Sequence, residues 1–162
     1  MRKHLLRASA SLALIVAFAC GGSSSAPSAS PPSGSCVNAS AAHHAYVVVE
    51  HLSGKTVQGC VGFAGAQITG DDLMSQSGIK YNAQTFTGLG KAVCQIDGEP
   101  AQFTECFPKD KPYWALLVST AGGPWADAQA GYATTNLKDG DALGWQYRQP
   151  TGSPPPPPLP KK

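Results

Sequence analysis

The chain has 162 residues, of which 42% are hydrophobic and 14% are charged, and its net charge is +2 at pH 7. Charges of both signs are interspersed, which excludes the basic stripe of a nucleic-acid-binding protein. The segment with the composition of a folded domain is residues 37–150, and about 110 residues suffice for one hydrophobic core but not for two.

Residues 1–19 predict a signal peptide for export. A positively charged start precedes the apolar run Leu12–Phe18, which is shorter than the about 20 residues of a membrane-spanning helix. An Ala-Phe-Ala tripeptide then leads directly to Cys20. This arrangement resembles the lipobox of bacterial lipoproteins, which implies a lipid on the Cys20 sulfur and anchoring to the outer face of the cell membrane. Ordinary cleavage after Ala19, which gives a secreted protein, is the alternative.

The segments on either side of the domain lack apolar periodicity. Residues 20–36 are rich in Gly, Ser and Pro and predict a flexible tether. Residues 151–162 contain five consecutive prolines and a basic end, which favours an extended polyproline II rod. We interpret this Pro-rich tail as a stiff spacer, and the alternative is a peptide that docks into an aromatic groove.

Most of the domain is predicted to be β-strand, because β-branched and aromatic residues cluster in short runs. The first two runs flank a Ser-Gly-Lys turn at residues 53–55 and predict a hairpin. The expected strands are Tyr46–Glu50, Thr56–Phe63, Ala92–Asp97, Tyr113–Ser119 and Leu143–Tyr147.

One short helix is expected over Thr69–Ser77. Thr69 suits the N-cap position, the carboxylates of Asp71 and Asp72 favour the first turn, and Gly78 ends the helix. Many short strands with a single helix predict an α+β fold built on a small, mostly antiparallel sheet.

The five cysteines are an odd number for an exported protein. Assigning Cys20 to a lipid leaves four for an oxidising compartment, and four cysteines allow three disulfide pairings. Cys94 and Cys106 flank a turn at residues 97–100, which favours them as a local pair and leaves Cys36 for Cys60. No CxxC spacing is present, so neither a zinc site nor a thioredoxin-like motif is expected.

Several motifs of the domain occur in an order that resembles one family. They are residues 88–93 (GLGKAV), 96–98 (IDG), 113–114 (YW), 122–125 (GGPW), 136–141 (NLKDGD) and 144–147 (GWQY). Over Val48–Tyr147 the chain resembles the DUF4430 family, similar to the C-terminal domain of transcobalamin, and in particular its exported actinobacterial lipoproteins. The resemblance implies a β-grasp-like sheet crossed by one helix. Transcobalamin-type proteins hold a corrinoid between this domain and a helical domain, which is not expected here.

The candidate ligand-binding residues are aromatic, because flat rings with polar tips suit a ring-shaped or apolar ligand. Alternation along the strands predicts that Tyr113 and Trp114 point to opposite faces and that Trp145 and Tyr147 share a face, which leaves one tryptophan free to be exposed. The alternative is that these rings fill the core. The candidates are Tyr113, Trp114, Trp125, Tyr132 and Trp145.

Residues with metal-binding or catalytic chemistry form no recognised motif. His43, His44 and His51 are expected at the surface, and Asp139-Gly140-Asp141 is expected to be a turn because no bidentate Glu follows it. Residues 122–124 are expected to be a plain connection, with a ligand-contacting loop as the alternative. The sequence lacks GxSxG, HExxH, SxxK and phosphate-loop motifs, so we expect no enzyme, no catalytic residues, no cofactor and no metal.

Two functional hypotheses follow. The first is a monomeric, surface-anchored binding domain that captures a small vitamin-like molecule, in its specific form a corrinoid, in association with a transporter. The second is an envelope structural or protein-interaction module without a small ligand, which docks another chain through a sheet edge or the proline tail. A dry apolar pocket lined by tryptophan would favour the first, and a filled core with an uncovered apolar strand edge would favour the second.

Overall fold

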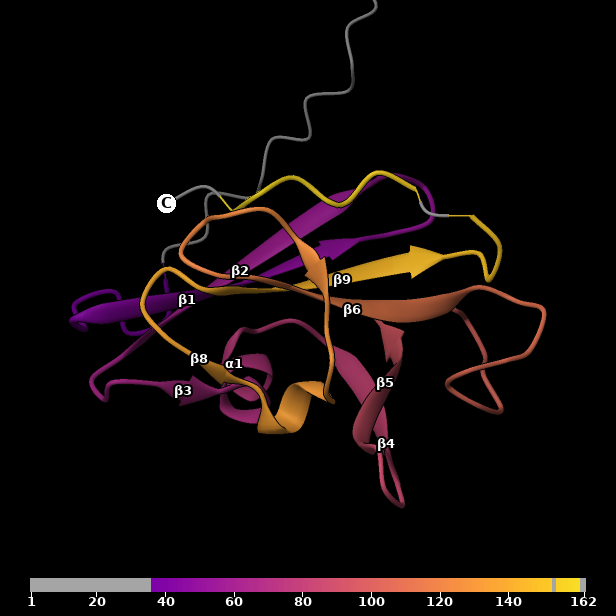
Figure 1. Cartoon of the computed structure of the whole chain (residues 1–162), viewed down its shortest axis with the longest axis horizontal. Helices are drawn as coiled ribbons and strands as arrows, with labels where there is room; N and C mark the ends of the chain where they lie inside the picture. The colour runs from indigo at the N-terminus through magenta and orange to yellow at the C-terminus, as the bar shows by residue number, and fades with distance from the viewer. Residues whose placement is uncertain (1–35, 153, 161–162) are drawn as a thin grey trace, which may run out of the picture.

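A five-stranded sheet organises residues 36–152 and 154–160, which are the residues that the computed structural model describes (Figure 1). The strand order is β2-β1-β9-β6-β7. The first long strand, β1 (His43–Glu50), and the last, β9 (Ala142–Arg148), are parallel neighbours, and the other pairs in this sheet are antiparallel. The remaining strands of the sheet are β2 (Thr56–Phe63), β6 (Tyr113–Ser119) and β7 (Ala126–Asp127).

The smaller elements lie together on one side of this sheet (Figure 1). They form two two-stranded sheets, β3-β8 and β4-β5, and two short helices. Their bounds are β3 (Ile68–Thr69), α1 (Gly70–Gln76), β4 (Tyr81–Phe86), β5 (Gly90–Ile96), η1 (Tyr132–Thr134, a 3-10 helix) and β8 (Asn136–Leu137). This arrangement is the predicted α+β class, a mostly antiparallel β-grasp-like sheet with one short α-helix.

The predicted helix is confirmed together with the residues expected to begin and end it. The Thr69 hydroxyl accepts a hydrogen bond from the Asp72 amide at 3.1 Å, and Gly78 has a φ of +76° just after the helix. The five predicted strands are also present. Strand β4 was missed because its residues are mostly polar and exposed.

The core lies between the main sheet and α1. Val47 and Val49 of β1 face α1, which contributes the buried side chains of Leu73 and Met74. The Trp145 indole of β9 joins them, with its Nε1 3.2 Å from the Met74 sulfur. This packing follows from alternation, because every second residue of a strand points to the same face.

Both favoured disulfide pairings are confirmed. The Cys36–Cys60 bond ties the start of the described chain to β2, where the Val37 amide donates to the Cys60 carbonyl at 2.9 Å. The Cys94–Cys106 bond ties β5 to the segment that precedes β6. Paired cysteines are typical of oxidising compartments outside the cytoplasm.

The predicted signal peptide (residues 1–19), the lipid site Cys20 and all but the last residue of the tether (residues 20–36) lie outside the described residues. Among the residues that are described, no helix has the length and apolar character that crossing a bilayer requires.

The Pro-rich tail does not extend away from the domain. Residues 154–160 run back over the main sheet on the side opposite α1 (Figure 1). The Trp125 indole Nε1 donates to the Pro157 carbonyl at 2.7 Å, and the Gln146 amide donates to the Pro155 carbonyl at 2.6 Å. The interpretation of the tail as a free spacer is therefore wrong, because an aromatic residue of the same chain binds it.

Gly70 provides a test of the packing of α1 against η1. A Cβ atom at Gly70 would collide with the carbonyl oxygen of Tyr132, whereas one at Gly65 would come no closer than 3.4 Å to its neighbours. We expect Gly70→Ala to lower the free energy of unfolding by about 3 kcal/mol, because η1 must move away from α1. Urea unfolding would measure the loss, with Gly65→Ala as the matched control. Equal stability of the two variants would contradict this packing.

Candidate ligand pocket

A cavity of about 260 Å³ opens between the main sheet and η1. Three buried aromatic residues line it, Trp114 from β6, Tyr132 from η1 and Trp145 from β9, and each is at most 2% exposed. The segment Ala128–Gly131 forms one wall and is held to β6 by a hydrogen bond from the Ala128 amide to the Leu116 carbonyl at 3.0 Å. The cavity is therefore lined by rigid, mostly apolar groups.

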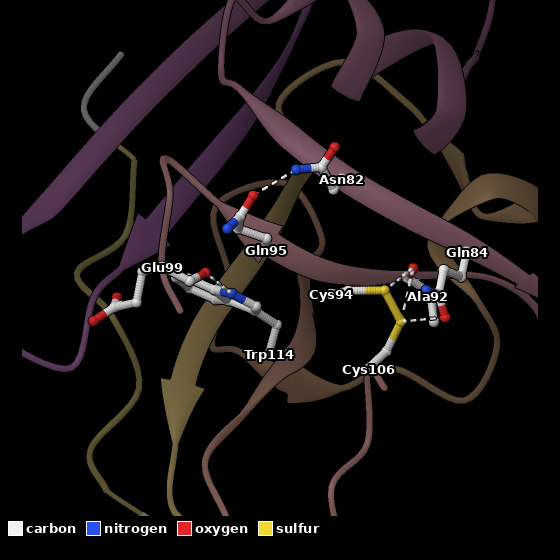
Figure 2. The surroundings of a disulfide bond; sticks show 8 residues. All are labelled: Asn82, Gln84, Ala92, Cys94, Gln95, Glu99, Cys106 and Trp114. Carbon is white, nitrogen blue, oxygen red and sulfur yellow. Dashed lines mark hydrogen bonds between the residues drawn. A yellow bond between two sulfur atoms is a disulfide. The ribbon is translucent and has the colours of Figure 1, made fainter. Parts of the chain in front are cut away.

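The polar atoms of the two indoles already have partners. Trp114 Nε1 donates to the Glu99 carbonyl at 2.9 Å, and Figure 2 shows this bond near the Cys94–Cys106 disulfide. Trp145 Nε1 lies against the Met74 sulfur. The rings of Tyr132 and Trp145 meet edge to face, with centroids 5.6 Å apart. The indoles therefore offer the cavity apolar ring surface rather than free hydrogen-bond donors.

The rim of the cavity carries two exposed apolar side chains. Leu89, at the turn between β4 and β5, is 50% exposed, and Phe107 is 46% exposed. Phe107 directly follows Cys106, so the Cys94–Cys106 disulfide keeps it close to β5. Large apolar side chains that gather in the open at one place are characteristic of binding sites.

Two cations also line the cavity, and each has an acidic partner. Lys91 Nζ lies 2.6 Å from Asp71, and this hydrogen bond is the main reason that the pKa of Lys91 is raised. Arg148 lies 2.9 Å from Asp127. Burial lowers the pKa of Arg148, but Asp127 and Tyr113 together outweigh burial and raise it. Both side chains are therefore positively charged, and of their two partners only Asp127 lines the cavity.

Tyr132 is buried with its hydroxyl in no hydrogen bond. Its pKa is raised well above the ordinary value of 10.0, mainly because burial disfavours the phenolate and also because Tyr81 and Asp71 lie nearby. The ring packs edge to face against Tyr81, with centroids 6.3 Å apart. Tyr132 therefore acts as an apolar wall of the cavity near neutral pH.

The structure brings together three of the five predicted aromatic residues and separates the other two. Tyr113 does not line the cavity and packs against Phe107, with ring centroids 6.3 Å apart. Trp125 lies against Gly144 on the outer face of the sheet, whereas the next residue, Trp145, points to the opposite face, into the core. The expectation that one tryptophan is exposed was wrong, because Trp114 and Trp145 are buried and Trp125 is half-buried under the tail.

The rim residues Leu89, Phe107, Lys91 and Arg148 were not predicted. Only Leu89 has a recognisable signal, a large apolar side chain in a Gly-Leu-Gly turn whose two glycines both have a φ of +82°. The others depend on contacts between segments far apart in the sequence.

His51 corrects the expectation that the histidines are surface residues. Its side chain is 9% exposed, its Nδ1 lies 2.7 Å from a Glu99 carboxylate oxygen, and its ring packs against the edge of Trp114. It therefore braces the turn that holds Trp114. No cluster of three or more His, Cys, Asp or Glu suited to a metal occurs within residues 36–152 and 154–160.

The predicted turn at residues 139–141 is confirmed. Asp141 accepts hydrogen bonds from the amides of Ala121 and Lys138, both at 2.8 Å, so its carboxylate is used within the fold. The connection at residues 122–124 is anchored by the Ser119 hydroxyl, which donates to the Gly123 carbonyl at 2.7 Å.

No protein-family model matches the sequence, and no curated protein does either. The resemblance to DUF4430 therefore stays a prediction that depends on the order of the motifs.

The buried phenol of Tyr132 predicts how stability depends on pH. Its pKa is higher in the folded protein than in the unfolded chain. The contribution of this phenol to the free energy of unfolding is therefore complete below about pH 10. It is lost as the pH rises above that value, because the phenol then ionises in the unfolded chain first. We expect Tyr132→Phe to unfold within about 1 kcal/mol of wild type at pH 8, because the hydroxyl makes no hydrogen bond. Between pH 8 and pH 11 the variant should lose less stability than wild type in urea unfolding. An equal loss would contradict a buried, protonated Tyr132.

Proposed function

We propose that this protein is an exported, non-catalytic binding domain that captures a small molecule in the pocket lined by Trp114, Tyr132 and Trp145. The observation that carries the proposal is an apolar cavity with an exposed apolar rim. Leu89 and Phe107 expose apolar surface to water that a ligand bound at the cavity would cover. A pocket lined by tryptophan supports this function over that of a purely structural module.

The pocket favours a flat, mostly apolar ligand that carries a carboxylate or another anionic group. The ring faces of the lining provide an apolar surface, and Lys91 and Arg148 place two positive charges at the cavity against the single carboxylate of Asp127. A cavity of about 260 Å³ is near the lower end of the range of about 300–1,000 Å³ that is usual for ligand sites. A small vitamin-like molecule suits this size, whereas a whole corrinoid would have to lie across the mouth, against Leu89 and Phe107.

The charged groups around the cavity support binding rather than catalysis. Lys91 and Arg148 are held in ion pairs, and the phenol of Tyr132 stays protonated near neutral pH. General acid–base catalysis needs a group whose pKa lies near the working pH, and neither the two cations nor Tyr132 meets that requirement.

The proposed location is the outer face of the cell membrane, with the domain held there by a lipid on Cys20. The two disulfide bonds support export because they form in oxidising compartments. Residues 20–36 would separate the domain from the membrane and leave the pocket accessible, beside a transporter or alone.

A paired substitution at the rim tests ligand binding. We expect Leu89→Ser with Phe107→Ser to raise the Kd for 8-anilinonaphthalene-1-sulfonate, a flat apolar anion, by about tenfold or more, because apolar contact area is lost. Fluorescence titration of the full-length protein measures this Kd. Leu52→Ser is the matched control, since Leu52 is 52% exposed and does not line the pocket.

The proposal would fail if the paired variant and Leu52→Ser bound the probe equally well. Adding cobalamin as a competitor tests the larger ligand separately. Displacement of the probe by cobalamin in wild type, and not in the paired variant, would extend the proposal to a corrinoid.

The lipid anchor has its own test. Cells that express the full chain are grown with a clickable fatty acid, and we expect the wild-type protein to be labelled and the Cys20→Ala variant to lose nearly all of the label. The variant has no sulfur to carry a lipid, so it should also move to the soluble fraction of the lysate or the medium. Equal labelling of both proteins would refute an anchor at Cys20.

A further inference from the structure

The tail occupies a groove on the face of the sheet opposite the ligand pocket. We call this the proline groove and define it by Trp125, Gly144 and Gln146. Gly144 allows the Trp125 ring to lie flat on the sheet, because a Cβ atom there would come within 2.9 Å of the indole. Gln146 is 3% exposed and Pro157 of the tail is buried. The groove is therefore formed by buried residues and is occupied by the chain's own tail.

Two apolar residues on the outer face of the sheet are buried. Val47 and Val49 point into the core, so Val48 between them points outward, yet it is only 1% exposed. Leu117 of β6 lies between two residues that pack on the core and is also buried. In Figure 1 the tail is the segment that runs across this face. Both residues are paired with Gly144, over which the Trp125 ring lies.

The chemistry of the groove suits a polyproline II segment of any origin. Such a segment has no internal hydrogen bonds, so its carbonyl oxygens are free to accept. The groove supplies two donors, Trp125 Nε1 and Gln146 Nε2, to the carbonyls of Pro157 and Pro155. Aromatic grooves that read extended proline-rich peptides work by this combination of ring surface and donors.

One atom of the groove has no partner when the tail is bound. Gln146 Nε2 donates both to Pro155 and to Glu50 Oε2, the latter at 2.8 Å, but Gln146 Oε1 is buried and accepts no hydrogen bond. Proline has no backbone N–H, so a run of prolines leaves this oxygen unsatisfied. An unsatisfied buried acceptor is costly, and a segment with one N–H at this point would remove the cost.

We propose that the proline groove docks a proline-rich segment of a second protein that carries one non-proline residue opposite Gln146, and that the chain's own tail is a resident competitor. The unsatisfied Gln146 oxygen favours a different protein over a second copy of this chain, because a second copy would bring the same prolines. The tail is joined to β9 by a short exposed segment with a Gly152 φ of +100°. Because the tail is attached to the domain, its effective concentration at the groove is high. Only a segment that binds the groove more tightly can displace it.

Peptides added in trans test this proposal on the full-length protein. The reference peptide has the tail sequence GSPPPPPLPKK, and each of five further peptides replaces one of the consecutive prolines by alanine. The readouts are the NMR signals of the Trp125 indole N–H, assigned with Trp125→Phe, and of the Gln146 side-chain amide. The peptides are titrated into a full-length variant with Pro155–Pro158 replaced by Gly and Ser, in which the groove is empty. If that variant fails to fold, the titration uses the wild-type protein and millimolar peptide, which competes with the tail.

We expect the reference peptide to shift both signals, and one alanine peptide to bind at least threefold more tightly than the reference because it supplies the missing N–H. Gly144→Ala should weaken binding at least tenfold, because it displaces the Trp125 ring, while Gly65→Ala should leave it unchanged.

Three results would overturn the proposal. They are unshifted signals at millimolar peptide, five alanine peptides that all bind no more tightly than the reference, and a concentration-dependent dimer that the Pro155–Pro158 variant cannot form. The last result would assign the groove to tail exchange between copies. Each leaves the binding of 8-anilinonaphthalene-1-sulfonate at Leu89 and Phe107 unaffected, so this proposal and the proposed function can fail separately.

Discussion

The alternation of side chains along β9 is the constraint on which the rest of the structure depends. This strand is central, with β1 parallel to it on one side and β6 antiparallel on the other. Successive residues therefore point to opposite faces: Trp145 enters the ligand pocket, while Gly144 and Gln146 build the proline groove. One short segment thus supplies two chemically different sites, and a shift of register by one residue would exchange their contents and abolish both.

A domain of about 110 residues has little core with which to hold such sites rigid. The two disulfides supply part of what the core lacks, and one of them lies beside the candidate ligand pocket. The Cys94–Cys106 bond fixes the segment that presents Phe107, and the backbone carbonyl of Glu99, braced by His51, positions Trp114. On the other face, the Trp125 ring lies over Gly144 and donates to the tail at Pro157. Each face is therefore covered by a segment remote in the sequence.

The sequence predicted those features that short stretches of chain determine. The helix was found because Thr69 is a local start signal and Gly78 a local stop signal, and the Cys94–Cys106 pair was found because a turn separates the two residues. The rings of Trp114, Tyr132 and Trp145 were recognised as candidates by type, but their meeting depends on the order of strands in the sheet. Trp125 was grouped with them because nothing in its neighbourhood indicates that Gly144 would draw it to the opposite face. The docking of the tail likewise joins residues about 30 positions apart, and composition alone favoured a rod.

The pairing of Val37 with β2 covers one end of an outer strand of the main sheet. The outermost strands of a sheet offer unpaired backbone groups to neighbouring molecules, and long flat ones seed fibrils. Here the Val37 amide and carbonyl bond to Cys60 and Gly62 on the free side of β2, fastened by the adjacent Cys36–Cys60 bond. At the opposite margin, β7 is only two residues long. The Cys36–Cys60 bond therefore also holds in place a segment that occupies backbone groups at the Phe63 end of β2, which would otherwise be open to another strand.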